Sequence, residues 1–134
     1  QAEAQAPALA AVRRVTEAIA PMPNIMAPFP AGVVRSGSKV GSKYKQLVAS
    51  TNHSLCPTLR GRVTSELVDG VNCVYEIVIN GLSEIAIAGA MRTGIEAAAG
   101  QGVVDISAGN YGGKLGKFHF QLHKGMAPAK SETA

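Results

Sequence analysis

Residues 71–81 constrain the fold of this chain more than any other stretch. β-branched and aromatic residues dominate them and Asn80-Gly81 closes them, which predicts a β-strand. Side chains along a strand alternate between two faces. One face is then wholly apolar and consists of Val71, Cys73, Tyr75, Ile77 and Ile79. The opposite face carries Asn72, Val74, Glu76, Val78 and Asn80.

Glu76 lies in the middle of that second face, between Val74 and Val78. If another element covers this face, the carboxyl group is partly desolvated. Desolvation favours the neutral form of a carboxyl group and makes it useful for proton transfer. If the face is open to water, Glu76 is an ordinary solvated carboxylate, which is the commoner situation. The residues alone leave both interpretations open.

The remaining pattern predicts an α+β domain. Apolar residues at helical spacing over 8–19 predict one helix, and Ser83 is a suitable N-cap for a second helix that ends at residue 99. Short strands are expected at 33–36, 44–50, 103–108 and 118–123. Two helices are too few to cover both faces of a sheet. This order favours a two-layer ferredoxin-like sandwich, in which an antiparallel sheet carries two main helices on one face.

The ends of the chain are expected to contribute little to this sandwich. Residues 1–6 are expected to fray, and residues 125–134 are expected to form a disordered tail. The opening strand of a ferredoxin-like lobe is either absent or lies upstream of Gln1. Residues 1–124 then make up one lobe.

Composition narrows the class of protein. The chain has 134 residues, enough for one domain with a single core, and a net charge of +4. Cys56 and Cys73 form no metal-binding motif, and reduced thiols are typical of a cytoplasmic protein. His119 and His123 lie about 13 Å apart on an extended strand, too far to share a metal ion. No apolar run reaches membrane-spanning length. We therefore expect a cytoplasmic domain without a metal site.

A basic segment, residues 35–45, contains two Gly-Ser-Lys units. Backbone N–H groups, hydroxyls and cations at this density can form a cradle for a phosphate or carboxylate. The candidate anion-binding residues are Arg35, Ser36, Ser38, Lys39, Ser42 and Lys43. An ordinary solvated connection between two strands explains the segment equally well. Stacking aromatics are nearly absent from it, which argues against a nucleic-acid platform.

Five ordered strings carry a resemblance to a known family. They are APFPAGVVRSGSKVGSK at 27–43, ASTN at 49–52 with CPT at 56–58, VYEIVING at 74–81, AMRTGIEA at 90–97 and ISAGNYGGKLG at 106–116. They resemble formylmethanofuran:tetrahydromethanopterin formyltransferase. The resemblance runs over residues 8–123. Members of this family contain two related ferredoxin-like lobes, and residues 1–124 resemble the C-terminal lobe.

The resemblance implies formyl transfer between a formylmethanofuran-type carrier and N5 of tetrahydromethanopterin in one-carbon metabolism. Direct acyl transfer of this kind needs no prosthetic group, and both carriers are substrates. It requires a group that donates and accepts a proton, and Glu76 is suited to this role. It also requires hydrogen-bond donors to an oxyanion, a role suited to Asn110 and the glycine-rich backbone. Arg35, Lys39, Lys43 and Lys114 would bind the polyanionic carriers. Asn52 is a further substrate-binding candidate.

The implied partners are the N-terminal lobe, further copies in a homo-oligomer and the other subunits of a formyltransferase/hydrolase complex. Neither nucleic acid nor membrane is expected. Activity is expected of the two-lobe protein rather than of this lobe alone. The rival hypothesis is a non-catalytic ferredoxin-like module that binds an anion or serves assembly.

Overall fold

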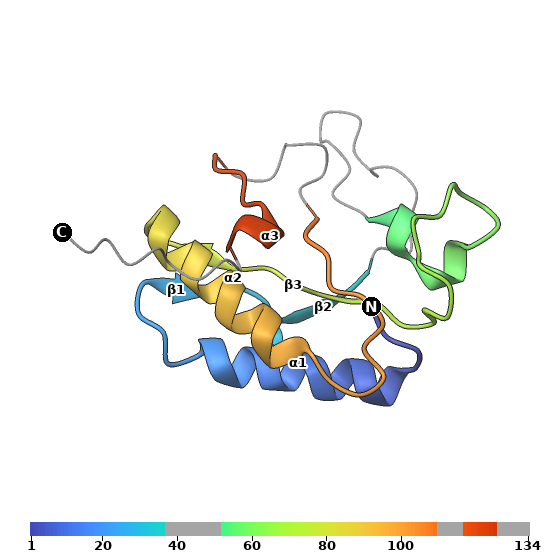
Figure 1. The fold of residues 1–134 in the computed structure, drawn as a ribbon, viewed down its shortest axis with the longest axis horizontal. Helices are drawn as coiled ribbons and strands as arrows, with labels where there is room; N and C mark the ends of the chain where they lie inside the picture. Colours follow the sequence, from blue (N-terminus) through green and yellow to red (C-terminus); the bar gives the residue numbers. More distant parts are fainter. Residues whose placement is uncertain (37–51, 110–116, 126–134) are drawn as a thin grey trace.

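The computed structural model describes residues 1–36, 52–109 and 117–125, and in these ranges the chain is an α+β protein (Figure 1). The elements in chain order are α1 (Gln5–Ile19), β1 (Ile25–Met26), η1 (Pro30–Gly32), β2 (Val33–Arg35), η2 (His53–Leu55), η3 (Pro57–Leu59), β3 (Tyr75–Ile77), β4 (Asn80–Gly81), α2 (Glu84–Ala98) and α3 (Leu122–Gly125). Within the described part, the strands form two antiparallel pairs, β1 with β4 and β2 with β3. The two long helices lie below β3 in Figure 1, and the segment with α3 lies above it.

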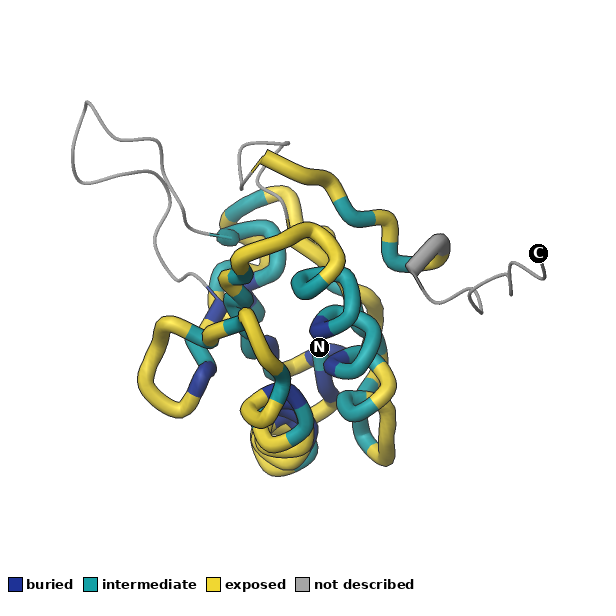
Figure 2. Tube along the Cα trace, turned by 90° about the vertical axis from the view of Figure 1, so that its left-hand side faces the viewer, coloured by how far each residue is buried: buried dark blue, intermediate teal, exposed yellow. Residues whose placement is uncertain are grey.

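Both long helices form where the pattern predicts them. The buried side of α1 consists of Ala8, Ala11, Val12, Val15 and Ile19, the predicted apolar stripe. The hydroxyl of Ser83 accepts a 3.2 Å hydrogen bond from the backbone N–H of Ala86 and so caps α2. The helices pack on each other through Val15, Ile19 and Ala90. The buried positions are few and lie toward the middle of the molecule (Figure 2).

The close contact of the two helices depends on two special residues. A Cβ at Gly94 would lie 3.2 Å from Cγ1 of Val15, so a larger residue there would push the helices apart. Arg14 of α1 closes the C-terminal end of α2. Its Nε donates to the carbonyl of Ala97 at 2.8 Å, and its Nη2 donates to the carbonyl of Ala98 at 2.9 Å. These carbonyls lack partners inside the helix, and a cation favours that end of the helix dipole.

The central stretch is extended, but it is not the single continuous strand that the sequence predicts. Cys73 bridges to Ala2, β3 pairs with β2, and β4 pairs with β1. The stretch therefore changes partner twice along its length. Its alternation is confirmed, because Ile77 and Ile79 pack against the helical core cluster.

Three expectations for the chain's other segments are wrong. Residues 1–6 are not frayed, because Ala2 is 2% exposed and bridges to both Cys73 and Val103. The expected strand at 103–108 is reduced to that bridge at Val103. The expected strand at 118–123 is replaced by irregular backbone and α3. Strands form only where backbone pairs with backbone, and in the described ranges no pairing involves residues 106–108 or 118–121.

Other expectations fall on residues that the structure does not describe. The predicted strand at 44–50 and residues 126–134 of the predicted tail lie outside the described ranges. In the described ranges, no helix is both long and apolar enough to cross a membrane.

Candidate functional site

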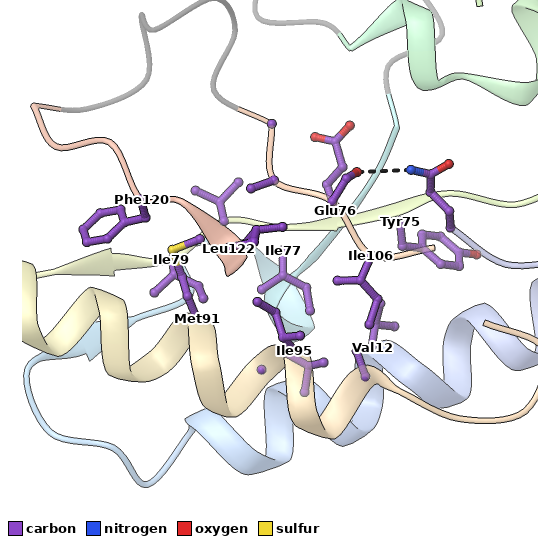
Figure 3. A pocket seen from close by; sticks show the side chains of 18 of the residues that line it. Val12, Tyr75, Glu76, Ile77, Ile79, Met91, Ile95, Ile106, Phe120 and Leu122 are labelled. Carbon is purple, nitrogen blue, oxygen red and sulfur yellow. Dashed lines mark hydrogen bonds between the residues drawn. The ribbon is translucent and has the colours of Figure 1, made fainter. Parts of the chain in front are cut away.

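A cavity of about 590 Å³ lies between the two extended segments and the helices. Residues 74–81 line one side of it and residues 103–109 line the other (Figure 3). Its floor is apolar and comes from both helices, through Val12, Val15, Met91, Ile95 and Ala98. Phe120 and Leu122 close the end near Ile79 and Met91 (Figure 3).

Glu76 stands at the rim of this cavity, on the face of β3 that points away from the helices. Its side chain points to the side opposite Ile77 (Figure 3). One carboxylate oxygen, Oε1, is fully shielded from solvent. Val34 lies opposite Glu76 on β2, and Val74 is only 5% exposed. The carboxyl group is therefore partly desolvated, as expected for a covered face.

Further polar groups share the rim. The side-chain amide of Gln1 donates to Oδ2 of Asp105 at 2.7 Å and to Oγ of Ser107 at 3.1 Å. A Cβ at Gly109 would lie 3.4 Å from Nδ2 of Asn52, so this amide lies against the backbone at Gly109. All five of these residues line the cavity together with Glu76. Two carboxyl groups, two amides and a hydroxyl on one rim can exchange a proton with a substrate and orient a carbonyl.

Ser36 holds the loop that brings Asn52 to this rim. It is 3% exposed, and its Oγ lies 3.0 Å from the carbonyl of Leu55 and 3.3 Å from that of Asn52. Its backbone N–H donates to the carbonyl of Val74 at 3.2 Å. The hydroxyl that the sequence assigns to an anion cradle thus faces two backbone carbonyls.

The structure does not bring Arg35 to Glu76. Arg35 pairs with Tyr75, so its side chain shares the face of Tyr75, opposite to the face of Glu76. The other candidate residues lie outside the described part of the chain. They are Ser38, Lys39, Ser42, Lys43, Asn110 and Lys114.

Comparisons with known proteins identify the family of this chain. Residues 1–124 match the family model described as FTR, proximal lobe. The chain belongs to the FTR family. This confirms the resemblance that the five sequence strings indicate.

Individual relatives of this FTR proximal lobe are highly similar. A formylmethanofuran–tetrahydromethanopterin formyltransferase of Methylococcus capsulatus is 58% identical over 130 residues, which are 94% of this chain and 44% of the relative. The enzyme of that name from Methanopyrus kandleri is 56% identical over 124 residues, 91% of this chain and 41% of the relative. The FTR lobe therefore spans less than half the length of these relatives.

Two solved structures share the fold of this lobe. The formylmethanofuran:tetrahydromethanopterin formyltransferase of Methanosarcina barkeri matches with a TM-score of 0.81 and 48% identity, over 92% of this chain and 43% of the other. The formyltransferase/hydrolase complex of Methylorubrum extorquens, solved with methylofuran, matches with a TM-score of 0.80 and 43% identity, over 93% and 42%.

Sequence reasoning missed the rim residues Gln1, Asp105 and Ser107 of this FTR lobe. The available signal was the alternation in 103–108, which places Asp105 and Ser107 on the side away from the apolar Ile106. His53 is the first residue of η2. Nδ1 of His53 is buried and has no hydrogen-bond partner among the described residues. Within those ranges no cluster of three His, Cys, Asp or Glu could hold a metal ion.

Proposed function

We propose that the full-length protein containing this lobe transfers a formyl group between a formylmethanofuran-type carrier and N5 of tetrahydromethanopterin. The observation that carries this proposal is the match of residues 1–124 to the FTR proximal lobe, together with a relative named for that activity that is 58% identical. The reaction is a step of one-carbon metabolism. Both carriers are substrates, and the transfer involves no change of redox state.

The transfer is a direct acyl exchange. The nucleophilic nitrogen attacks the formyl carbon, and the carbonyl oxygen becomes an oxyanion in a tetrahedral intermediate. Collapse of this intermediate breaks the bond to the other nitrogen, which leaves as an amine. Glu76 accepts the proton that the attacking nitrogen loses and returns it to the leaving nitrogen. The partly covered position of its carboxyl group supports this role.

The remaining candidate residues would position the carriers. The amide of Asn52, the backbone at Gly109 and the side chain of Asn110 would donate to the oxyanion. The carriers' anionic groups would be bound by Arg35, Ser38, Lys39, Ser42, Lys43 and Lys114. Ser36 would contribute by holding the loop of Asn52 in place.

We also propose a ferredoxin-like arrangement for residues 1–124 and a cytoplasmic, multi-lobe assembly. The pairing of β2 with β3, and of Ala2 with both Cys73 and Val103, fits the strand order of such a sheet. The lobe would work with the N-terminal lobe in a homo-oligomer. The Methylorubrum structure is a formyltransferase/hydrolase complex, which supports an assembly of that kind for this protein too.

The test is the change Glu76→Gln in the full-length protein. The variant keeps the shape of the side chain but cannot carry the proton, so kcat should fall about 10²- to 10⁴-fold. KM for both carriers and Tm should stay close to the parent values, because the group acts mainly in the transition state. Glu96→Gln, at an exposed position of α2, is the matched control and should leave turnover unchanged.

Two outcomes would contradict the proposal at different levels. Normal turnover in a folded Glu76→Gln variant would remove the acid–base role from Glu76 and leave the activity standing. A full-length parent protein that transfers no formyl group between the two carriers would overturn the activity itself.

A further inference from the structure

We propose that Asp105 binds the N–H groups at the pyrimidine edge of the pterin carrier. On this edge a pterin carries an exocyclic amino group beside a ring N–H, so two donors point the same way. A carboxylate accepts two parallel donors of this kind. The inference rests on the proposed function and adds to it the residue that would distinguish a pterin from other ring systems.

The carboxyl group of Asp105 has accepting capacity to spare. It lines the cavity together with Glu76, and the residue is half-buried. Its Oδ2 accepts one N–H from Gln1 at 2.7 Å, whereas an ionised carboxyl group has about four acceptor positions. Among the described residues no other hydrogen bond reaches this carboxyl group, and no side-chain cation pairs with it. A half-buried anion in this state is stabilised when a donor binds to it.

Gln1 fixes the direction of this carboxyl group. A carboxylate cannot donate, so the side-chain amide of Gln1 must turn its NH2 group toward Asp105. The second N–H of this amide goes to Oγ of Ser107 at 3.1 Å. The backbone links the same pair, because the N–H of Asp105 donates to the carbonyl of Gln1 at 3.4 Å. Asp105 is therefore oriented before a ligand arrives, which lowers the entropic cost of binding.

Gln1 and Glu76 lie on the same face of the sheet. Ala2 bridges antiparallel to Cys73, so Gln1 lies opposite Val74. Side chains that lie opposite each other share a face, and Val74 shares its face with Glu76. The side chain of Gln1 is thus a diagonal neighbour of Glu76.

Asp105 lies on the other side of Gln1, on this same face. Ile106 points toward the helices (Figure 3), so the preceding Asp105 points away from them. Residues 1–2 lie between the two extended segments, which are therefore two strand spacings, or about 10 Å, apart. A flat two-ring carrier that lies over Gln1 would meet Glu76 on one side and Asp105 on the other.

This order of groups matches the chemistry of a pterin. N5, the atom that takes the formyl group, belongs to one ring, and the donor edge belongs to the other ring. With Asp105 on the donor edge, the ring that contains N5 extends toward Glu76, the proposed acid–base group. A furan ring carries no N–H, so Asp105 should serve only the pterin carrier.

The competing role for Asp105 is purely structural, as the residue that holds Gln1. An amide oxygen accepts the N–H of Gln1 as a carboxylate oxygen does, so Asp105→Asn keeps this bond and the shape of the side chain. It removes the charge and the capacity to accept two donors at once. The exposed Lys117 also lines the cavity, but in the described structure it forms no ion pair with Asp105.

The first test is the change Asp105→Asn in the full-length protein. Because a charged hydrogen bond is lost, KM for tetrahydromethanopterin should rise about 10- to 100-fold. KM for the formylmethanofuran-type carrier and Tm should stay close to the parent values. Asp69→Asn, at an exposed position, is the matched control and should change neither KM. An equal rise of both KM values in Asp105→Asn would assign the residue a structural role and overturn the proposal, as would no rise at all.

The second test uses two ring fragments and needs no turnover. Pterin has the amino group and the ring N–H of the carrier, whereas lumazine has a carbonyl in place of the amino group. Calorimetry at pH 7 should show that the full-length parent protein binds pterin more tightly than lumazine, by about tenfold or more. An Asn side chain offers one acceptor and one donor, which matches lumazine. The preference for pterin should therefore disappear or reverse in Asp105→Asn.

The outcomes separate this proposal from the proposed function. Equal binding of pterin and lumazine to the parent protein, which is measured without any substitution, would overturn the role of Asp105. An unchanged preference for pterin in the folded variant would do the same. If the parent prefers pterin through Asp105 but transfers no formyl group, the pterin site stands and the proposed function fails. If it transfers the formyl group without this preference, the proposed function stands and the pterin site fails.

Discussion

Replacement of Ser36 by Ala should weaken the fold, because the structure makes this hydroxyl an anchor. Its Oγ lies 3.0 Å from the carbonyl of Leu55 and 3.3 Å from that of Asn52, and the residue is 3% exposed. Loss of a typical hydrogen bond costs about 1 kcal/mol, and a buried carbonyl left without its donor costs about 1–3 kcal/mol. The carbonyl of Asn52 keeps the N–H of Leu55 at 3.2 Å. We therefore expect a loss of roughly 1–2 kcal/mol in the free energy of unfolding.

Urea unfolding measures this loss, with Ser65→Ala as the matched control. Ser65 is exposed, and its Oγ makes only two long, exposed hydrogen bonds, to the carbonyl of Ser54 at 3.5 Å and from the N–H of Leu67 at 3.3 Å. Its removal should therefore change stability by less than about 0.5 kcal/mol. Calorimetry of carrier binding to the full-length protein completes the assay. If Ser36→Ala unfolds like the control but binds a carrier more weakly, the anchor reasoning is refuted and the hydroxyl belongs to the anion cradle.

Two further changes test the packing of the helices and their ends. Gly102 has φ +77°, and a Cβ there would lie 2.5 Å from a proline ring carbon of α1. The change Gly102→Ala should therefore lower the free energy of unfolding in urea by about 1–3 kcal/mol more than Gly70→Ala does. Gly70 has φ +85° and open space around it, so Gly70→Ala costs only the strain of a left-handed backbone, roughly 1–2 kcal/mol. Equal losses of unfolding free energy in the two variants would contradict the predicted clash at Gly102. Arg14→Gln should lower the free energy of unfolding by about 1 kcal/mol more than Arg13→Gln does. The reason is that, in the described structure, only Arg14 of this pair donates hydrogen bonds to the last turn of α2. Equal melting temperatures of the two variants would refute this.

The sequence by itself determined the two helices and which side chains of the central stretch, residues 71–81, turn toward them. Helical hydrogen bonds are local, so the apolar spacing over 8–19 and the Ser83 cap suffice to predict α1 and α2. The alternation in 71–81 likewise predicts that Ile77 faces the helices and that Glu76 faces away from them.

The tertiary structure alone decided which extended segments pair and what each polar rim residue contacts. A strand is defined by a neighbour that is distant in the sequence, so the β-propensity of 103–108 did not produce a strand without a partner beside it. Ala2, expected to fray, is fixed because Cys73 and Val103 bond to it from both sides. The sequence predicts that the hydroxyl of Ser36 binds an anion, but in the structure it contacts backbone carbonyls 16 and 19 residues away. Pairings of this range depend on the packed chain as a whole, which is why local pattern did not reveal them.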